Sequence, residues 1–119
     1  STPLPTGTVG QAVAQQVAEA EADGVPVVGI DAIGLLESSL VNHCHRTVAV
    51  TAPEELRVKR IMAREGISRG VCRLRVAAQK PSAWFQERCD DTLESTEADT
   101  VETFAQRARA LFTNILQEG

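Results

Sequence analysis

The sequence predicts an α/β protein in which helices flank a parallel sheet. Two short apolar runs, residues 25–30 (VPVVGI) and 47–51 (TVAVT), are rich in β-branched residues and lack polar alternation. Such runs are typical of strands that are buried on both faces. Longer segments with helical periodicity lie before, between and after them. Strands that alternate with helices favour right-handed crossovers and a parallel sheet.

Length and composition bound the possible functions. The 119 residues predict a single domain over 1–119, and with three Phe and one Trp its core must be mainly aliphatic. A net charge of −4 argues against a nucleic-acid partner, and no apolar run has membrane-spanning length. Three widely spaced cysteines without a CxxC motif indicate reduced thiols, so we expect a cytoplasmic location.

The first part of the chain predicts a helix, a strand and a short turn. Residues 6–23 carry an apolar stripe at helical spacing, and Gly24 ends this helix. Asp31 follows the run at 25–30, at the end of a strand where α/β sheets keep their ligand crevice. It could hold Mg²⁺ or its water shell, or equally cap the next helix. Residues 34–41 predict a short helix or turn from which Glu37 projects.

The next segments give a loop, a strand and a helix. Residues 42–46 (NHCHR) place two histidines around a cysteine, but i and i+2 do not converge on one side of a helix, which favours a polar loop over a metal site. After the strand at 47–51, Pro53 with Glu54 and Glu55 opens a helix.

Residues 59–79 concentrate positive charge in an otherwise acidic chain and predict two helices joined by a hinge. Gly66 can end the first helix in the left-handed conformation, and Ser68 can cap the second. Gly70 costs about 1 kcal/mol relative to Ala, so we expect the second helix to be loosely held. A mobile lid over a phosphate site (66–80) and a solvated helical face both fit this pattern. The arginines are Arg60, Arg64, Arg69, Arg73 and Arg75.

The end of the chain predicts two more helices. Pro81 ends the lid and begins another helical turn, and residues 89–96 could hold a short edge strand around Thr92 and Leu93. A closing amphipathic helix is predicted from residue 97 or 98 to 117.

Four stretches together resemble the dephospho-CoA kinase family of P-loop kinases. Residues 27–38 (VVGIDAIGLLES) are similar to the family's strand ending in Asp and its Pro-Leu-Leu-Phe-Glu segment, and 48–60 (VAVTAPEELRVKR) to its next strand and helix. The most specific match is the lid, REGIS at 64–68 followed by RVAAQ at 75–79. Thr2-Pro3 falls where the family has His-Pro.

The sequence also departs from the family pattern. Ile33-Gly34 replaces Pro-Leu, and Ser95 stands where the family tends to have an Asn near the adenine. The family's GxxxxGKS/T phosphate loop is not found: Gly24 and Gly29 have its glycine spacing, but Ile30-Asp31 follows. Since the chain also begins with Ser, we expect it to be the C-terminal part of a longer kinase, a partial P-loop NTPase fold with a helical lid.

The resemblance implies a function for the full-length parent: ATP phosphorylates the ribose 3′-hydroxyl of dephospho-CoA with Mg²⁺. Arg64 and Arg75 would close over the ATP phosphates, Asp31 would lie near the metal or the acceptor, and Ser95 on the adenine side. The acceptor side would be lined by Leu35, Leu36 and Glu37. No direct metal ligand and no certain catalytic residue is expected in this chain, which we expect to be inactive alone.

Two alternatives remain at this stage. The chain could be a non-catalytic kinase-like module that binds a partner, or belong to a nucleoside monophosphate kinase, which shares the lid but has another acceptor pocket. Without the family's first strand, the predicted strand would have an unpaired edge at 27–30, so we expect the chain to self-associate through this edge as an oligomer or swapped dimer.

Overall fold

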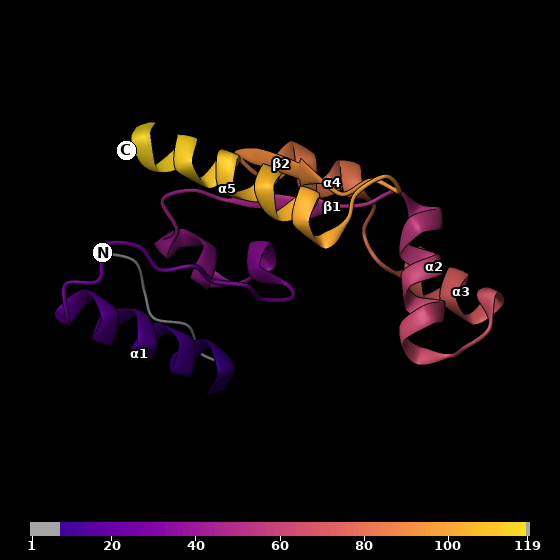
Figure 1. The fold of residues 1–119 in the computed structure, drawn as a ribbon. Coiled ribbons are helices and arrows are strands. Elements are labelled where there is room, and N and C mark those ends of the chain that lie inside the picture. The colour runs from indigo at the N-terminus through magenta and orange to yellow at the C-terminus, as the bar shows by residue number, and fades with distance from the viewer. Residues whose placement is uncertain (1–7, 119) are drawn as a thin grey trace. The chain divides into compact units, whose positions relative to one another are not determined.

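The structure is a computed structural model that describes residues 8–118. The chain divides after Thr47 into two compact units, each of which is described by itself. Figure 1 shows the course of the chain through both units. Thr2 and Pro3, which were compared with a family His-Pro, lie outside the described residues. None of the described helices is long and apolar enough to cross a membrane.

Residues 8–47, the described part of the first unit, contain one long helix and two short turns of 3₁₀-helix. The predicted first helix is confirmed as α1 (Thr8–Ala22), and Gly24 follows it with φ 74°. The short helix expected at 34–41 is present as η1 (Leu35–Glu37) and η2 (Ser39–His43). Ser38 caps η2, because its hydroxyl accepts a hydrogen bond from the Leu40 N–H at 3.1 Å.

The prediction of a strand at 25–30 is wrong. This segment has no regular secondary structure, and Val25, Val27 and Val28 are 46%, 55% and 44% exposed. Pro26 lacks an N–H for a sheet ladder, and Gly29 weakens an extended segment. An extended segment also needs a paired neighbour, and within residues 8–118 only the two strands described next pair with each other. The predicted self-association therefore loses the strand edge on which it was based.

The second unit is built around two parallel strands. The strands are β1 (Val48–Thr51) and β2 (Asp91–Glu94), with Val48 opposite Asp91 and Thr51 opposite Glu94. The first strand was predicted, the second was given as a possible edge strand around Thr92 and Leu93, and their parallel pairing confirms the α/β class. Ala49 and Leu93 are buried, whereas Val50 on the alternate face is 65% exposed.

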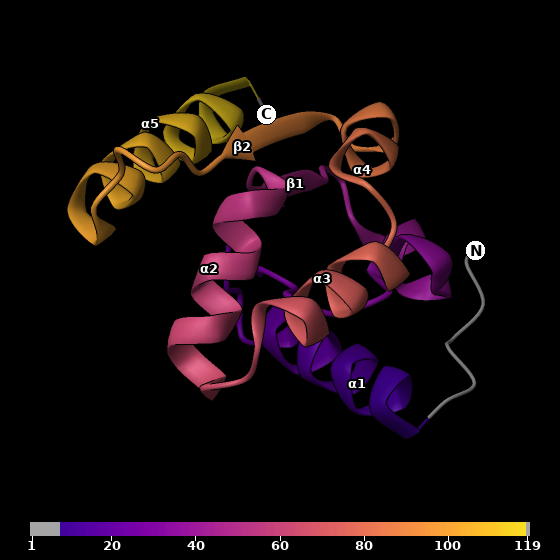
Figure 2. The same ribbon diagram turned by 90° about the vertical axis from the view of Figure 1, so that its right-hand side faces the viewer.

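Two helices after β1 form a hairpin with its own small core. These helices are α2 (Glu54–Glu65) and α3 (Arg69–Ala78), which lie beside each other in Figures 1 and 2. Gly66 ends α2 with φ 67°, and the Ser68 hydroxyl accepts from the Val71 N–H at 3.3 Å, as predicted. The buried side chains are Val58, Cys72 and Val76, with Ile61, Met62 and Ile67 packed against them.

Two further helices contact the strands. The predicted turn after Pro81 is confirmed as α4 (Ser82–Arg88), which contacts β1. The closing helix α5 (Val101–Glu118) contacts β2 and begins later than predicted. Its late start has a local cause, because the Asp99 carboxylate accepts from the Thr96 N–H at 2.9 Å and from the Thr103 hydroxyl at 3.0 Å. These bonds hold residues 96–99 in a turn before the helix.

Candidate phosphate-binding site

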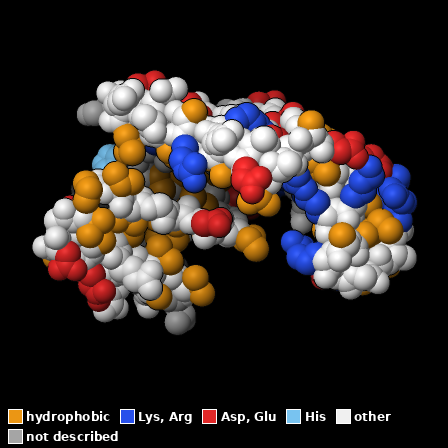
Figure 3. Space-filling model, viewed as in Figure 1, with side chains coloured by type: hydrophobic (Ala, Val, Ile, Leu, Met, Phe, Trp, Pro, Cys, Tyr) orange, Lys and Arg blue, Asp and Glu red, His pale blue; other side chains and the backbone are white. Residues whose placement is uncertain are grey.

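Basic side chains gather over the α2–α3 hairpin, with acidic side chains among them (Figure 3). Glu55, in the first turn of α2, accepts from two arginines of α3. Arg69 Nη1 lies 3.1 Å from Glu55 Oε2, and Arg73 Nη2 lies 2.8 Å from Oε1. All three side chains are about half exposed, so these ion pairs add little to stability. Through these ion pairs, the single charge of Glu55 offsets part of the positive charge of both arginines.

The two arginines predicted to close over phosphates are brought together by one carboxylate. Arg75 Nη1 donates to both oxygens of Glu65, at 2.8 and 2.9 Å, and Arg64 Nη2 lies 3.4 Å from Glu65 Oε2. The hydrogen bond from Arg75 is the main reason that the pKa of Glu65 is lowered, and it raises the pKa of Arg75. Glu65 therefore brings these two guanidinium groups together and offsets part of their positive charge.

A third arginine lies at the carboxyl ends of the strands. Arg60 Nη2 donates to the Ser95 hydroxyl at 2.7 Å, and the Ser95 N–H donates to the Thr51 carbonyl oxygen at 2.7 Å. Ser95 is buried, and so is Thr51, whose hydroxyl has no hydrogen-bond partner in the described part of the chain. These three residues meet where parallel sheets place their ligands. Sequence reasoning assigned no role to Arg60 or Thr51, because only the parallel pairing brings them to Ser95.

The predicted acceptor-side residues all lie in the first unit. Leu35 and Leu36 are half-buried in η1, whereas Glu37 at its end is exposed. Asp31 is exposed and lies in irregular backbone, so the expectation that it ends a strand is wrong. Its proposed contact with the metal or the acceptor stays a prediction.

The described residues hold no group of three or more His, Cys, Asp or Glu side chains that could bind a metal ion directly. The cysteine of the NHCHR segment, Cys44, instead directs its thiol at the Leu40 carbonyl oxygen 3.7 Å away, and burial raises its pKa. Cys72 and Cys89 are also free thiols.

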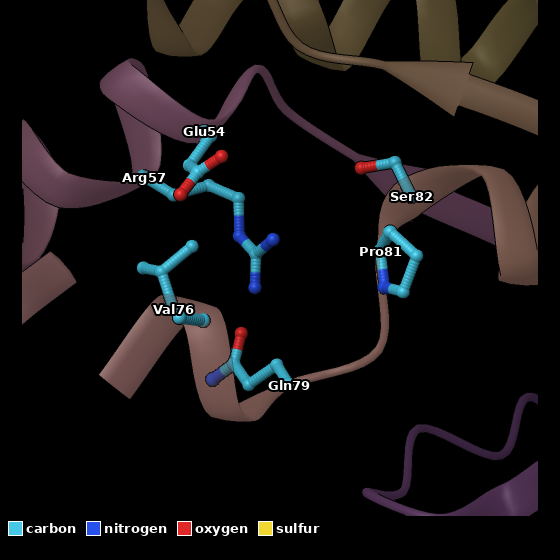
Figure 4. A pocket seen from close by; sticks show the side chains of 7 residues that line it. Glu54, Arg57, Val76, Gln79, Pro81 and Ser82 are labelled. Atoms are coloured by element: carbon cyan, nitrogen blue, oxygen red, sulfur yellow. The ribbon is translucent and has the colours of Figure 1, made fainter. Parts of the chain in front are cut away.

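A pocket opens between the start of α2, the end of α3 and the start of α4, with a volume of about 360 Å³. Figure 4 shows the Arg57 side chain extending into it, with Gln79 below and Ser82 opposite. No residue of this pocket was singled out as a site by sequence reasoning, because its wall comes from three separate helices. The other labelled side chains that line it are Glu54, Val76 and Pro81.

Comparison with solved structures supports this architecture. The fold resembles the crystal structure of TT1252 from Thermus thermophilus, with a TM-score of 0.61 and 27% sequence identity. The match covers 84% of this chain and 52% of that one. The parallel sheet and its flanking helices thus place the chain in the α/β class.

The family follows from the sequence comparisons. The family model described as CoaE, dephospho-CoA kinase, matches residues 4–100, and the chain belongs to this family. A dephospho-CoA kinase from Thermus thermophilus is 38% identical over 71 residues, which is 60% of this chain and 35% of the relative. One from Geobacter sulfurreducens is 36% identical over 66 residues, 56% of this chain and 34% of the relative. The chain thus spans about a third of the length of the curated relatives it matches.

Proposed function

We propose that the protein to which this chain contributes transfers the γ-phosphoryl group of ATP to the ribose 3′-hydroxyl of dephospho-CoA. The observation that carries this proposal is the family match over residues 4–100, which includes both strands and the whole hairpin. The pairing of Arg64 and Arg75 on one carboxylate supports it, because the side chains that the family resemblance assigns to phosphates already converge.

In the proposed mechanism the ATP phosphates take the place of Glu65. A guanidinium group binds phosphate oxygens with charge-assisted, paired hydrogen bonds, and it stays charged at every physiological pH. Arg64 and Arg75 lie on different helices, so a phosphate that binds both also fixes the angle of the hairpin. Their positive charge stabilises the negative charge on the transferred group in the transition state.

Closure of the lid would exclude water from the transfer. Gly66 is the expected hinge, since its left-handed backbone conformation is strained for other residues and it links α2 to α3. The segment 66–80 is the moving part in this proposal. Without water at the reacting group, the phosphoryl group passes to the acceptor hydroxyl and is not lost to hydrolysis.

The family resemblance assigns the acceptor side of the reaction to residues of the first unit. Leu35 and Leu36 offer apolar contacts from η1, and Glu37 offers a carboxylate at its end. Asp31 is the carboxylate that would hold Mg²⁺ through its water shell, and Mg²⁺ supplies charge neutralisation for the ATP phosphates. Ser95 would lie on the adenine side, held in place by Arg60 and by the Thr51 carbonyl oxygen.

We propose further that the 119-residue chain does not transfer phosphate when expressed alone. No GxxxxGKS/T segment occurs in it, so the backbone cradle that P-loop kinases use for the phosphates is not supplied by these residues.

The test is a phosphoryl-transfer assay on the complete protein in its native length, with ATP and dephospho-CoA, that detects coenzyme A. The complete protein should form coenzyme A and the 119-residue chain should not. Failure of the complete protein to form it would contradict the proposal and favour a non-catalytic module.

Replacing a lid arginine is the sharper experiment. Arg75→Gln should raise the KM for ATP by about tenfold or more, because a charge-assisted phosphate contact is lost. Arg109→Gln is the matched control, since Arg109 is an exposed arginine of α5. Equal effects of the two variants would show that Arg75 acts only through net charge.

A further inference from the structure

The pocket between α2, α3 and α4 contains a basic side chain that the proposed kinase mechanism does not use. Arg57 is half-buried and lines this pocket with its guanidinium group (Figure 4). It forms neither a hydrogen bond nor an ion pair through its side chain with any residue of the range 8–118. A half-buried charge without a counter-charge is costly unless an anion or water satisfies it.

This state is unusual for the chain, because the other basic side chains of the hairpin are satisfied by the protein itself. Arg64 and Arg75 bind Glu65, while Arg69 and Arg73 bind Glu55. Lys59 pairs with Glu97 at 2.5 Å, and Arg60 donates to Ser95. Across residues 8–118, Arg109 shares with Arg57 the lack of such partners, but Arg109 is exposed. Arg57 therefore combines an uncommitted guanidinium group with a pocket.

Two neutral side chains add hydrogen-bonding capacity around Arg57. The Gln79 side chain comes from the end of α3 and the Ser82 hydroxyl from the start of α4, and both line the pocket. An amide N–H₂, a hydroxyl and a guanidinium group are all donors, and together they match the several acceptor oxygens of a phosphate group.

The remaining wall is partly apolar. Val76, Ala77 and Pro81 line the pocket beside these donors. The volume of about 360 Å³ exceeds the space needed by an inorganic phosphate ion, which leaves room for an attached organic group. A phosphate monoester with a small apolar group thus fits the wall better than the bare ion.

Glu54 also lines the pocket and opposes an anion there. It forms no ion pair with Arg57 within 4.0 Å, so it weakens the positive field of Arg57 without neutralising it. Removing the Glu54 charge should therefore strengthen anion binding. Its effect on the affinity is opposite to the effect of removing Arg57.

From this geometry we propose that the pocket is a binding site for a small organic phosphate, held by Arg57, Gln79 and Ser82 with its apolar part against Val76 and Pro81. This site is separate from the phosphate contacts assigned to Arg64 and Arg75. It does not depend on the kinase reaction proposed above, since every lining residue lies in the second unit of this chain.

The test is a titration of the isotope-labelled 119-residue chain with inorganic phosphate and with phenyl phosphate, followed by amide NMR at constant ionic strength. The Gln79 side-chain amide and the Ser82 backbone amide should shift with a saturable dependence on each ligand. Phenyl phosphate should bind at least about fivefold more tightly, because its ring buries apolar surface. Equal affinities for inorganic phosphate and phenyl phosphate would contradict the proposal that the ligand carries an organic group.

The variants separate a built site from general attraction of anions. Arg57→Gln should weaken binding of both probes by about tenfold or more, since a charge-assisted hydrogen bond is lost. Arg109→Gln removes the same charge from α5 and should leave binding unchanged, while Glu54→Gln should tighten it. If Arg57→Gln and Arg109→Gln behave alike, or if the shifts spread evenly over the basic surface, the proposal is overturned.

Discussion

Arg75 and Arg57 belong to the same helical hairpin but differ in what surrounds them. Arg75 is exposed and held by both oxygens of Glu65, whereas Arg57 is half-buried in a pocket and has no protein partner among residues 8–118. An anion that binds Nη1 of Arg75 has to compete with the Glu65 carboxylate, whereas an anion that binds Arg57 breaks no ion pair. The density of arginines in a sequence therefore does not by itself show which of them are available to a ligand.

The difference also separates two kinds of function. A phosphate contact that competes with an internal carboxylate can be switched, because the protein has a stable alternative when the ligand leaves. A contact that has no internal competitor can be made without breaking an ion pair in the protein. The hairpin combines both kinds within two helices, so each can be disturbed while the other is measured.

The largest expected effect comes from the small core of the hairpin that carries both arginines. Val58 is fully buried on α2, in a cluster with Cys72 and Val76 of α3. Val58→Ala should destabilise the second unit by about 2 kcal/mol, because it removes buried methyl groups and leaves a cavity. Chemical denaturation, followed by the circular dichroism of the helices, measures this change in the free energy of unfolding. Leu74→Ala on the exposed face of α3 is the control, and an equal loss there would contradict the proposed position of the core.

A smaller effect should separate the two arginines directly. Glu65→Gln removes the internal competitor of Arg64 and Arg75, so pyrophosphate should bind the hairpin a few-fold more tightly, in line with the modest strength of exposed ion pairs. Binding of phenyl phosphate at Arg57 should not change. Calorimetric titration with each ligand measures both quantities. Glu97→Gln, which frees Lys59 instead, is the matched control; the same gain there would mean that net charge alone is responsible.

The smallest effect is the pH dependence of the Glu65 pair. The pKa of Glu65 is lowered below its ordinary value, mainly by the hydrogen bond from Arg75. The stabilisation by this pair is therefore fully present above the ordinary, unfolded-state pKa of 4.5 and is lost as the pH falls through the lower folded-state pKa. The melting temperatures of the wild type and of the Glu65→Gln variant should converge as the pH drops from 6 to 3. A constant difference would show that the pair does not titrate in this way.

Much of the second unit could be predicted because its signals are local. Pro53 and the carboxylates after it predicted the start of α2, Gly66 its end, and Ser68 the cap of α3. The strand at 25–30 could not be assigned correctly, since an apolar run becomes a strand only when a neighbour pairs with it. Likewise, the start of α5 was missed because the side chain of Asp99 competes with helix formation before Val101.

The candidate site was predictable only in part. The family resemblance led to Arg64 and Arg75, but nothing in their spacing indicated that Glu65 would bind both. The contact between Arg60 and Ser95 joins residues that are 35 positions apart, and the Arg57 pocket is closed by three helices. Such sites depend on tertiary packing, so periodicity and capping signals do not reveal them.

The most direct test of the contrast between these arginines is to follow their side-chain Nε–H signals by NMR while pyrophosphate is added to the 119-residue chain. Arg57 should shift first, at the lowest concentrations, and Arg75 should shift only later, as pyrophosphate displaces Glu65. In the Glu65→Gln variant, the Arg75 signal should reach the midpoint of its shift at a lower pyrophosphate concentration. The midpoint for Arg57 should not change. If Arg75 responds before Arg57 in the wild-type chain, or if both shift together in both proteins, the proposed difference between an occupied and an open arginine is contradicted.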